Sequence, residues 1–261
     1  MTIYHQYAPF YDANGQLRFT LLMGHYLGEL LGHHPVHGRR VLDLACGTGT
    51  LALLLAGQGW DVVGLDAAEP MLVQARAKAA ALDTPGRAAF VSGDMRALPE
   101  GAGTPGLRPG SFDLVTCIYD SLNYLLAEAD LVACFAGVAR MLRPGGLFVA
   151  DMNTRHFLEH DWGTCTVEEQ PGFVQVAQSH FDPQTGCSVM VLTGFAGDDK
   201  HGYTRFDETH IERAYPEEQV SALLEASGLH VEATYDCFTF QPVYTQSQRI
   251  AWVARRTGFQ G

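Results

Sequence analysis

The sequence lacks three features, which are typical of a membrane protein, a secreted protein and a zinc-binding protein. It contains no apolar run close to the roughly 20 residues that a bilayer-spanning helix needs. Its first residues, Met1 to Gln6, lack the basic and apolar regions of a secretory signal peptide. The six cysteines show no paired C-x-x-C spacing of the kind found in zinc sites. We therefore expect a cytoplasmic protein with free thiols, no bound metal and no membrane contact.

Positive charge is also scarce. The chain carries 17 lysines and arginines against 29 aspartates and glutamates, which gives a formal net charge of −12. Such an acidic surface repels phosphate backbones, so we expect no nucleic-acid partner. The 261 residues, 47% of them hydrophobic, are enough for one large domain or for one domain with an addition.

Apolar runs and helical patterns alternate along most of the chain. After one or two helices in residues 1–40, the pattern predicts strands at 41–45, 62–65, 89–92, 114–118 and 147–151, with helices at 51–58, 71–82 and 122–142. This alternation predicts a parallel sheet with right-handed crossovers. Residues 165–214 instead alternate in strand fashion, and a helix at 216–227 and strands near 229–235 and 249–254 follow.

These patterns divide the chain into three parts. We expect a helical cap over residues 1–40 and a cofactor-binding core made of 41–154 and 215–261. An antiparallel β insert over 155–214, after the fifth strand, is expected to cover the active site.

The most informative motif is Val41-Leu-Asp-Leu-Ala-Cys-Gly-Thr-Gly-Thr50, a strand that ends in an acid and turns through two glycines into a helix. One interpretation is a dinucleotide site with pyrophosphate at the helix N-terminus, as in an NAD-dependent oxidoreductase. However, Asp43 at the strand end would repel pyrophosphate and attract a cationic group. This favours S-adenosylmethionine, which carries an ammonium and a sulfonium but no phosphate.

Acids also follow the next two predicted strands. Asp66 ends the second strand, where a carboxylate can accept both hydroxyls of a ribose. Its spacing from Asp43 is close to the roughly 20 residues expected between a glycine turn and a ribose-binding acid. Asp94 and Met95 follow the third strand. We expect Asp94 to accept a hydrogen bond from the exocyclic amine of adenine and Met95 to lie against the ring.

With Phe112-Asp-Leu-Val-Thr and Leu142-Arg-Pro-Gly-Gly-Leu-Phe148, these motifs resemble class I S-adenosylmethionine-dependent methyltransferases over residues 40–151. The resemblance implies an α/β, Rossmann-like fold with a seven-stranded, mostly parallel sheet, helices on both faces and an antiparallel last strand. One departure is Ala45, where many members have glycine. The cofactor-binding residues expected on this basis are Tyr11, Asp43, Ala45, Cys46, Gly47, Gly49, Asp66, Ala67, Met71, Asp94, Met95, Cys117 and Tyr119.

A narrower resemblance concerns Tyr7-Ala-x-x-Tyr11-Asp12, Tyr119-Asp-Ser-Leu-Asn-Tyr-Leu125 and the β insert. These segments are similar to small-molecule methyltransferases, including enzymes that N-methylate amino sugars. In that subgroup the N-terminal segment and the insert roof the active site and often mediate oligomers, which implies a homodimer through the insert. The Asn-Pro-Pro-Tyr signature of amino-methylating nucleic-acid enzymes is replaced by Tyr119-Asp-Ser-Leu122.

The activity implied is methyl transfer to an N or O nucleophile of a small molecule, by in-line attack on the sulfonium methyl. The residues expected to line that space are Tyr7, Tyr11, Tyr119, Asp120, Asn123 and Tyr124. Of these, Tyr11, Asp120 and Tyr124 are the catalytic candidates together with His156, and Asp120 or His156 is the candidate base. Alternatively, Asp120 caps a helix and Tyr124 belongs to the core. A non-catalytic protein that binds the cofactor or a partner remains a further alternative.

Overall fold

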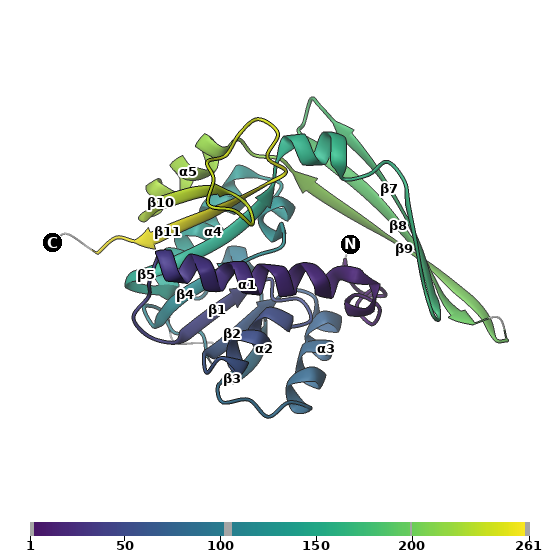
Figure 1. Ribbon diagram of the computed structural model, residues 1–261, viewed down its shortest axis with the longest axis horizontal. Helices are drawn as coiled ribbons and strands as arrows, with labels where there is room; N and C mark the ends of the chain where they lie inside the picture. Colours follow the sequence, from purple (N-terminus) through teal and green to yellow (C-terminus); the bar gives the residue numbers. More distant parts are fainter. Residues whose placement is uncertain (1–2, 102–105, 199, 259–261) are drawn as a thin grey trace.

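A seven-stranded sheet with the order β3-β2-β1-β4-β5-β11-β10 forms the centre of the structure. The structure is a computed structural model that describes residues 3–101, 106–198 and 200–258 (Figure 1). The strands are β1 (Arg40–Leu44), β2 (Asp61–Asp66), β3 (Arg87–Ser92), β4 (Phe112–Cys117), β5 (Leu142–Asn153), β10 (Leu229–Asp236) and β11 (Arg249–Arg256). Strands β1 to β5 pair in parallel, and β11 runs antiparallel to both of its neighbours. The expected mostly parallel sheet with an antiparallel last strand is confirmed.

Helices cover both faces of this sheet, as expected. They are α1 (Leu17–His33), α2 (Thr50–Gly57), α3 (Glu69–Ala80), α4 (Glu128–Met141) and α5 (Glu217–Ala226). Helices α1 and α2 pack against Val41 and Leu114, whereas α4 and α5 pack against the opposite face with Leu42 and Val115. Successive strand residues point to opposite faces, so each buried strand supplies both hydrophobic layers. None of the described helices is long and apolar enough to cross a membrane.

The helix expected over 122–142 is shorter in the structure. A 3₁₀ turn, η3 (Ser121–Tyr124), comes first, and α4 begins only at Glu128. The backbone between them leaves the helical region, because Ala127 is extended. Glu128 then places a negative charge in the first turn of α4, where it complements the helix dipole. Strand β5 in turn begins at Leu142, earlier than expected.

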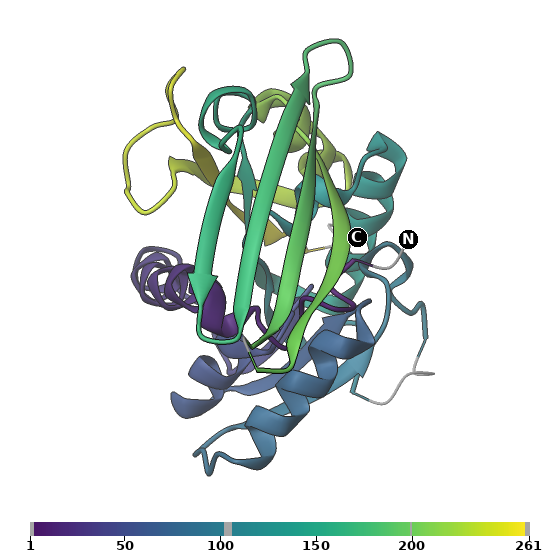
Figure 2. The same cartoon turned by 90° about the vertical axis from the view of Figure 1, so that its right-hand side faces the viewer.

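The expected β insert forms a separate four-stranded antiparallel sheet after β5 and a short turn, η4 (Phe157–Asp161). Its strands, in spatial order, are β6 (Thr166–Gln170), β7 (Phe173–Asp182), β8 (Cys187–Asp198) and β9 (Gly202–Arg213). Figure 1 shows this sheet projecting from the core, and Figure 2 shows it face on. A hairpin turn follows β7, where the carboxylate of Asp182 accepts the N–H of Gln184 at 2.9 Å.

Residues 3–16, here called the N-terminal segment, lie between the core and the insert and end in the turn η1 (Asp12–Gln16). Glu208 of β9 accepts the backbone N–H groups of Tyr4, Gln6 and Tyr7 at 2.7, 2.9 and 3.2 Å. The ring of Phe10 also stacks on a phenylalanine of β7. The N-terminal segment is therefore bound to the insert. The division of the chain into cap, core and insert stays a prediction.

Candidate functional site

Two cavities meet in this structure at a wall of tyrosines. The first has a volume of about 610 Å³ and lies at the carboxyl ends of β1, β2 and β3. The second has a volume of about 660 Å³ and is enclosed by the N-terminal segment, the inner face of the insert and the chain around β11. Tyr4, Tyr11, Tyr119 and Tyr124 line both cavities. These four side chains therefore lie where the two cavities adjoin.

Asp43 supplies a buried carboxylate to the first cavity. Its residue is 1% exposed, and Thr116 Oγ1 donates a hydrogen bond to Oδ1 at 2.7 Å. The second oxygen, Oδ2, has no hydrogen-bond partner in the part of the chain that the structure describes. Burial raises the pKa of Asp43 to about 7. A buried acceptor without a partner at a cavity wall is suited to a cationic group, such as the ammonium of S-adenosylmethionine.

The turn after β1 brings the backbone to the cavity and orients Asp66. Gly47 and Gly49 have φ angles of +54° and +75°, and a Cβ added to Gly49 would lie 2.6 Å from the Phe90 ring. The carboxylate of Asp66 accepts the N–H of Gly47 at 2.7 Å and that of Ala68 at 2.8 Å. Burial raises the pKa of Asp66. The end of β2 is thus fixed against the glycine turn, as a ribose-binding acid requires.

The residues after β3 line the first cavity, but Asp94 already has a cationic partner. Its carboxylate accepts the backbone N–H of Arg96 at 2.8 Å and a guanidinium N–H at 2.6 Å. This pairing lowers the pKa of Asp94. Met95 and Arg96 line the same wall, so Arg96 is a cavity residue that the sequence analysis did not identify.

Most of the expected cofactor-binding residues lie together around this cavity. Those that line it are Tyr11, Asp43, Ala45, Cys46, Gly47, Asp66, Ala67, Met71, Asp94, Met95 and Tyr119. Cys117 and Gly49 are not among its lining residues. The Cys117 side chain is fully buried with its sulfur 4.0 Å from that of Met95, and Ile118 lines the cavity instead.

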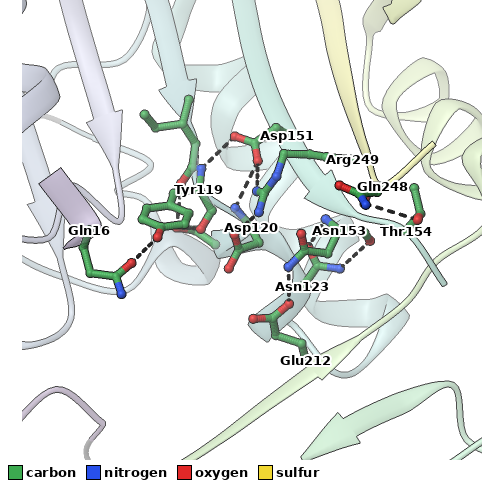
Figure 3. A network of polar contacts seen from close by, with 12 residues as sticks. Gln16, Tyr119, Asp120, Asn123, Asp151, Asn153, Thr154, Glu212, Gln248 and Arg249 are labelled. Carbon is green, nitrogen blue, oxygen red and sulfur yellow. Dashed lines mark hydrogen bonds and ion pairs between the residues drawn. The ribbon is translucent and has the colours of Figure 1, made fainter. Parts of the chain in front are cut away.

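A strained turn after β4 presents side chains to the second cavity. Tyr119 and Asp120 both have left-handed backbones, with φ angles of +63° and +51°. The carboxylate of Asp151 accepts the N–H of Tyr119 at 2.7 Å and that of Asp120 at 3.2 Å. Arg249 of β11 pairs with Asp151 and, at 2.6 Å, with Asp120, as Figure 3 shows. Asp120 therefore does not cap η3 with its side chain.

Strand β9 adds two buried titratable side chains to the second cavity. Glu212 accepts a hydrogen bond from Asn153 Nδ2 at 2.8 Å (Figure 3). Burial, reinforced by the negative charge of Asp120, raises the pKa of Glu212 well above its usual value. Nδ1 of His210 shares a hydrogen bond with the Tyr124 hydroxyl at 3.1 Å, and burial lowers the pKa of His210.

The sequence analysis did not identify these two residues. The available signal was the spacing of Glu208, His210 and Glu212, because alternate residues of one strand share a face. In the structure that face lies toward the N-terminal segment and the second cavity.

The remaining candidates are divided between the cavities and the surrounding structure. Tyr7 and Asp120 line the second cavity. Asn123 is buried and donates to the carbonyl oxygens of Asn153 and Arg213, so it holds β5 to β9. His156 lines neither cavity, and its Nε2 lies 3.6 Å from Asp161. Within residues 3–101, 106–198 and 200–258, no three His, Cys, Asp or Glu side chains are grouped to hold a metal ion.

Comparisons with known proteins agree with this geometry. The model of a methyltransferase domain family matches residues 41–146. The putative methyltransferase YqeM of Bacillus subtilis (strain 168) is 31% identical over 218 residues, which cover 84% of each chain. A dTDP-3-amino-3,4,6-trideoxy-alpha-D-glucopyranose N,N-dimethyltransferase of Streptomyces venezuelae is 26% identical over 79% of this chain and 81% of its own.

A solved structure extends the similarity to the whole fold. The S-adenosylmethionine-dependent methyltransferase from Clostridium acetobutylicum ATCC 824 superposes with a TM-score of 0.81 at 26% identity, covering 98% of this chain and all of that one. The residues that the comparisons place in the methyltransferase domain include the glycine turn, Asp43 and Asp66 of the first cavity. The chain therefore belongs to the class I S-adenosylmethionine-dependent methyltransferases.

Proposed function

We propose that this methyltransferase transfers the methyl group of S-adenosylmethionine to an amine nitrogen of a small molecule. The observation that carries the proposal is the second cavity, which meets the cofactor cavity at four tyrosines and presents buried carboxylates beside aromatic rings. Carboxylates and aromatic faces both attract ammonium groups. The relative from Streptomyces venezuelae, named as an N,N-dimethyltransferase, supports an amine acceptor.

The residues of the first cavity fit S-adenosylmethionine, which when bound supplies a methyl group on a positively charged sulfur. Asp43 would hold its ammonium through Oδ2, which has no hydrogen-bond partner among the described residues. Asp66 would accept the ribose hydroxyls, and Met95 would lie against adenine. Held in this way, the cofactor would lie in a cavity that the tyrosine wall also lines.

The tyrosine wall and the acids behind it would act on the acceptor. Burial raises the pKa values of Tyr4, Tyr11 and Tyr124, so their phenols stay protonated and neutral at neutral pH. Neutral phenols orient an amine by hydrogen bonds and exclude water from the transfer path. An ammonium must lose a proton before its nitrogen lone pair can attack, and the carboxylate of Asp120 lies at the second cavity to take it.

The test is acceptor profiling with matched pairs of compounds. The enzyme is incubated with S-adenosylmethionine and a panel in which each small amine has a counterpart with a hydroxyl in its place. Mass spectrometry then identifies methylated products together with S-adenosylhomocysteine. We expect methylation on nitrogen in the amine members. Methylation of the hydroxyl counterparts in preference to the amines would overturn the proposal.

We further propose that the protein works in the cytoplasm without a nucleic-acid or membrane partner, and as a homodimer through the insert. The net charge of −12 and the free cysteines support the first statement. Strand β6 supports the second, because it is an edge strand whose five residues are all exposed, with Val167 66% exposed. Light scattering on the wild-type protein and on Val167→Lys tests the dimer, since a lysine in that interface would yield monomers.

A further inference from the structure

We propose that the second cavity binds its acceptor as an organic cation that carries no phosphate, so that the acceptor is not a nucleotide-linked sugar. This inference rests on the proposed function and narrows the class of acceptor. It separates this chain from the relative whose name specifies a dTDP-linked amino sugar.

The charge of the cavity wall is the first argument. Among the residues that the structure describes, four acidic side chains line the second cavity, those of Asp120, Glu168, Glu212 and Asp236. Among the described residues that line it, Arg249 is the one arginine or lysine. A diphosphate brings two negative charges, which need cationic or N–H donors around them. This wall offers the opposite charge.

The single arginine is already engaged, which is the second argument. Its guanidinium pairs with Asp120 at 2.6 Å and with Asp151, and its side chain is only 11% exposed. The same guanidinium lies over the Phe19 ring at 4.6 Å from the ring centroid. Binding a phosphate here would require Arg249 to leave two carboxylates unpaired in a buried site, which is strongly unfavourable.

The aromatic lining is the third argument, and it favours a cation. The rings of Tyr4, Tyr11, Tyr119 and Tyr124 stand at the end of the cavity next to the cofactor, and Tyr4 and Tyr11 meet edge to face at 5.7 Å. Aromatic faces around an ammonium form the recognised cage for alkylated amines. Glu212 lines the same cavity and is close enough to Tyr4 and Tyr124 to raise their pKa values.

The size of the cavity also decides where a nucleotide carrier attached to the acceptor would lie. An acceptor amine at the tyrosine wall would place the rest of its molecule within the remaining part of a cavity of about 660 Å³. Beyond the tyrosines, the lining of this cavity includes Glu168, Asp236 and neutral amides such as Gln175. A diphosphate attached to the acceptor would therefore lie against carboxylates rather than cations.

Calorimetry on the full chain saturated with S-adenosylhomocysteine tests the inference with two probes. Benzyltrimethylammonium is a cation that cannot be methylated further, and dTDP represents the nucleotide carrier. We expect the cation to bind with a Kd below about 1 mM and dTDP to give no saturable heat at the same concentration. Because the pKa of Glu212 is raised, we also expect cation binding to release a proton, which is measured by repeating the titration in buffers of different ionisation enthalpy.

Two variants assign the cation site, and a third is the matched control. Glu212→Gln should weaken cation binding about tenfold and abolish proton release, and Asp236→Asn, outside the buried network, should weaken it less. Glu169→Gln removes an exposed carboxylate of β6 that does not line the cavity, and should change nothing. Unchanged S-adenosylhomocysteine binding shows that each variant is folded.

The outcomes separate this inference from the proposed function. Saturable dTDP binding by the wild-type protein, or cation binding that neither Glu212→Gln nor Asp236→Asn weakens, would overturn the inference even if amines are methylated. Absence of cation binding would overturn it as well. Methylation of hydroxyl groups in the acceptor panel would instead overturn the proposed function.

Discussion

The Nζ of Lys78 lies 2.6 Å from Oδ2 of Asp12, which joins helix α3 to the N-terminal segment. The same ammonium contacts Thr50 Oγ1 at 2.8 Å, and Thr48 Oγ1 donates to Oδ1 of Asp12 at 2.7 Å. The segment that carries Tyr4 and Tyr11 is therefore fixed to the glycine turn of the cofactor cavity.

The first prediction follows from this connection. We expect Lys78→Met to increase the dissociation rate of S-adenosylhomocysteine about tenfold, because Asp12 loses its charged partner and the N-terminal segment opens more often. Stopped-flow fluorescence measures the rate. The control is Arg76→Met on the same helix, where an exposed ion pair with Glu69 contributes little. Equal rates in wild type and Lys78→Met would show that this segment does not retain the ligand.

A second prediction concerns the acid at the end of β2. Asp66→Ala should weaken S-adenosylhomocysteine binding at least tenfold, since it removes the proposed acceptor of the ribose hydroxyls and frees the N–H of Gly47. Calorimetry measures the affinity. Asp61→Ala, at the opposite end of the same strand, is the matched control and should bind like the wild type. Affinity that survives Asp66→Ala would contradict the assignment.

The third prediction is a pH dependence that originates at Asp43. Its pKa is raised to about 7 by burial, and an ammonium favours the ionised carboxylate. The ionised fraction grows as pH rises from 6 to 8, so the affinity for S-adenosylhomocysteine should rise over that range and level off above it. Calorimetric titrations across this range check the slope. Asp43→Asn should bind S-adenosylhomocysteine more weakly, and its affinity should not change with pH over this range. If the affinity of Asp43→Asn rises with pH as steeply as that of the wild type, the pH dependence does not originate at Asp43.

Stability is the subject of the fourth prediction. Asp151→Ala should lower the free energy of unfolding by about 3 kcal/mol, because it deprives buried Arg249 of a partner and two left-handed residues of their acceptor. Urea denaturation followed by circular dichroism measures the change. Asp83→Ala, in an exposed loop, serves as the control with a change near zero. If Asp151→Ala lowers the free energy of unfolding no more than Asp83→Ala does, the contacts of Asp151 with Arg249, Tyr119 and Asp120 do not stabilise the fold.

The fifth prediction distinguishes two catalytic candidates by their positions. With an amine that the wild type methylates, Tyr124→Phe should lower kcat about tenfold, since the lost hydroxyl stands between the cavities and pairs with His210. His156→Gln should leave kcat and KM unchanged, because His156 lines neither cavity. Steady-state kinetics provide both values. If His156→Gln lowers kcat more than Tyr124→Phe does, the acceptor must bind in a different place.

The sequence predicts the core well because its signals are local. Only 26 residues of chain contain the strand that ends in Asp43, the glycines that follow it and the strand that ends in Asp66. The apolar residues of these elements recur at regular intervals. Parallel pairing then brings strand ends together without further information, so most of the expected cofactor residues meet at one cavity.

The second cavity was harder to predict because its residues come from distant parts of the chain. Asp120, Glu212 and Arg249 are brought together by packing of the insert and β11 on the turn after β4. No local pattern reports such a cluster. The α4 start at Glu128 and the position of His156 outside the cavities have the same cause, since tertiary packing decides where the chain turns.

The two cavities are lined by different parts of the fold, and this difference has a consequence for engineering. The first cavity is built from strand ends of the parallel sheet, whereas the second cavity takes its polar wall from the N-terminal segment and the insert together with the turn after β4 and the chain around β11. The insert pairs with none of the strands of the central sheet. Exchange of residues 166–213 together with the N-terminal segment is thus a route to a chimera that keeps its methyl donor and acquires a new acceptor.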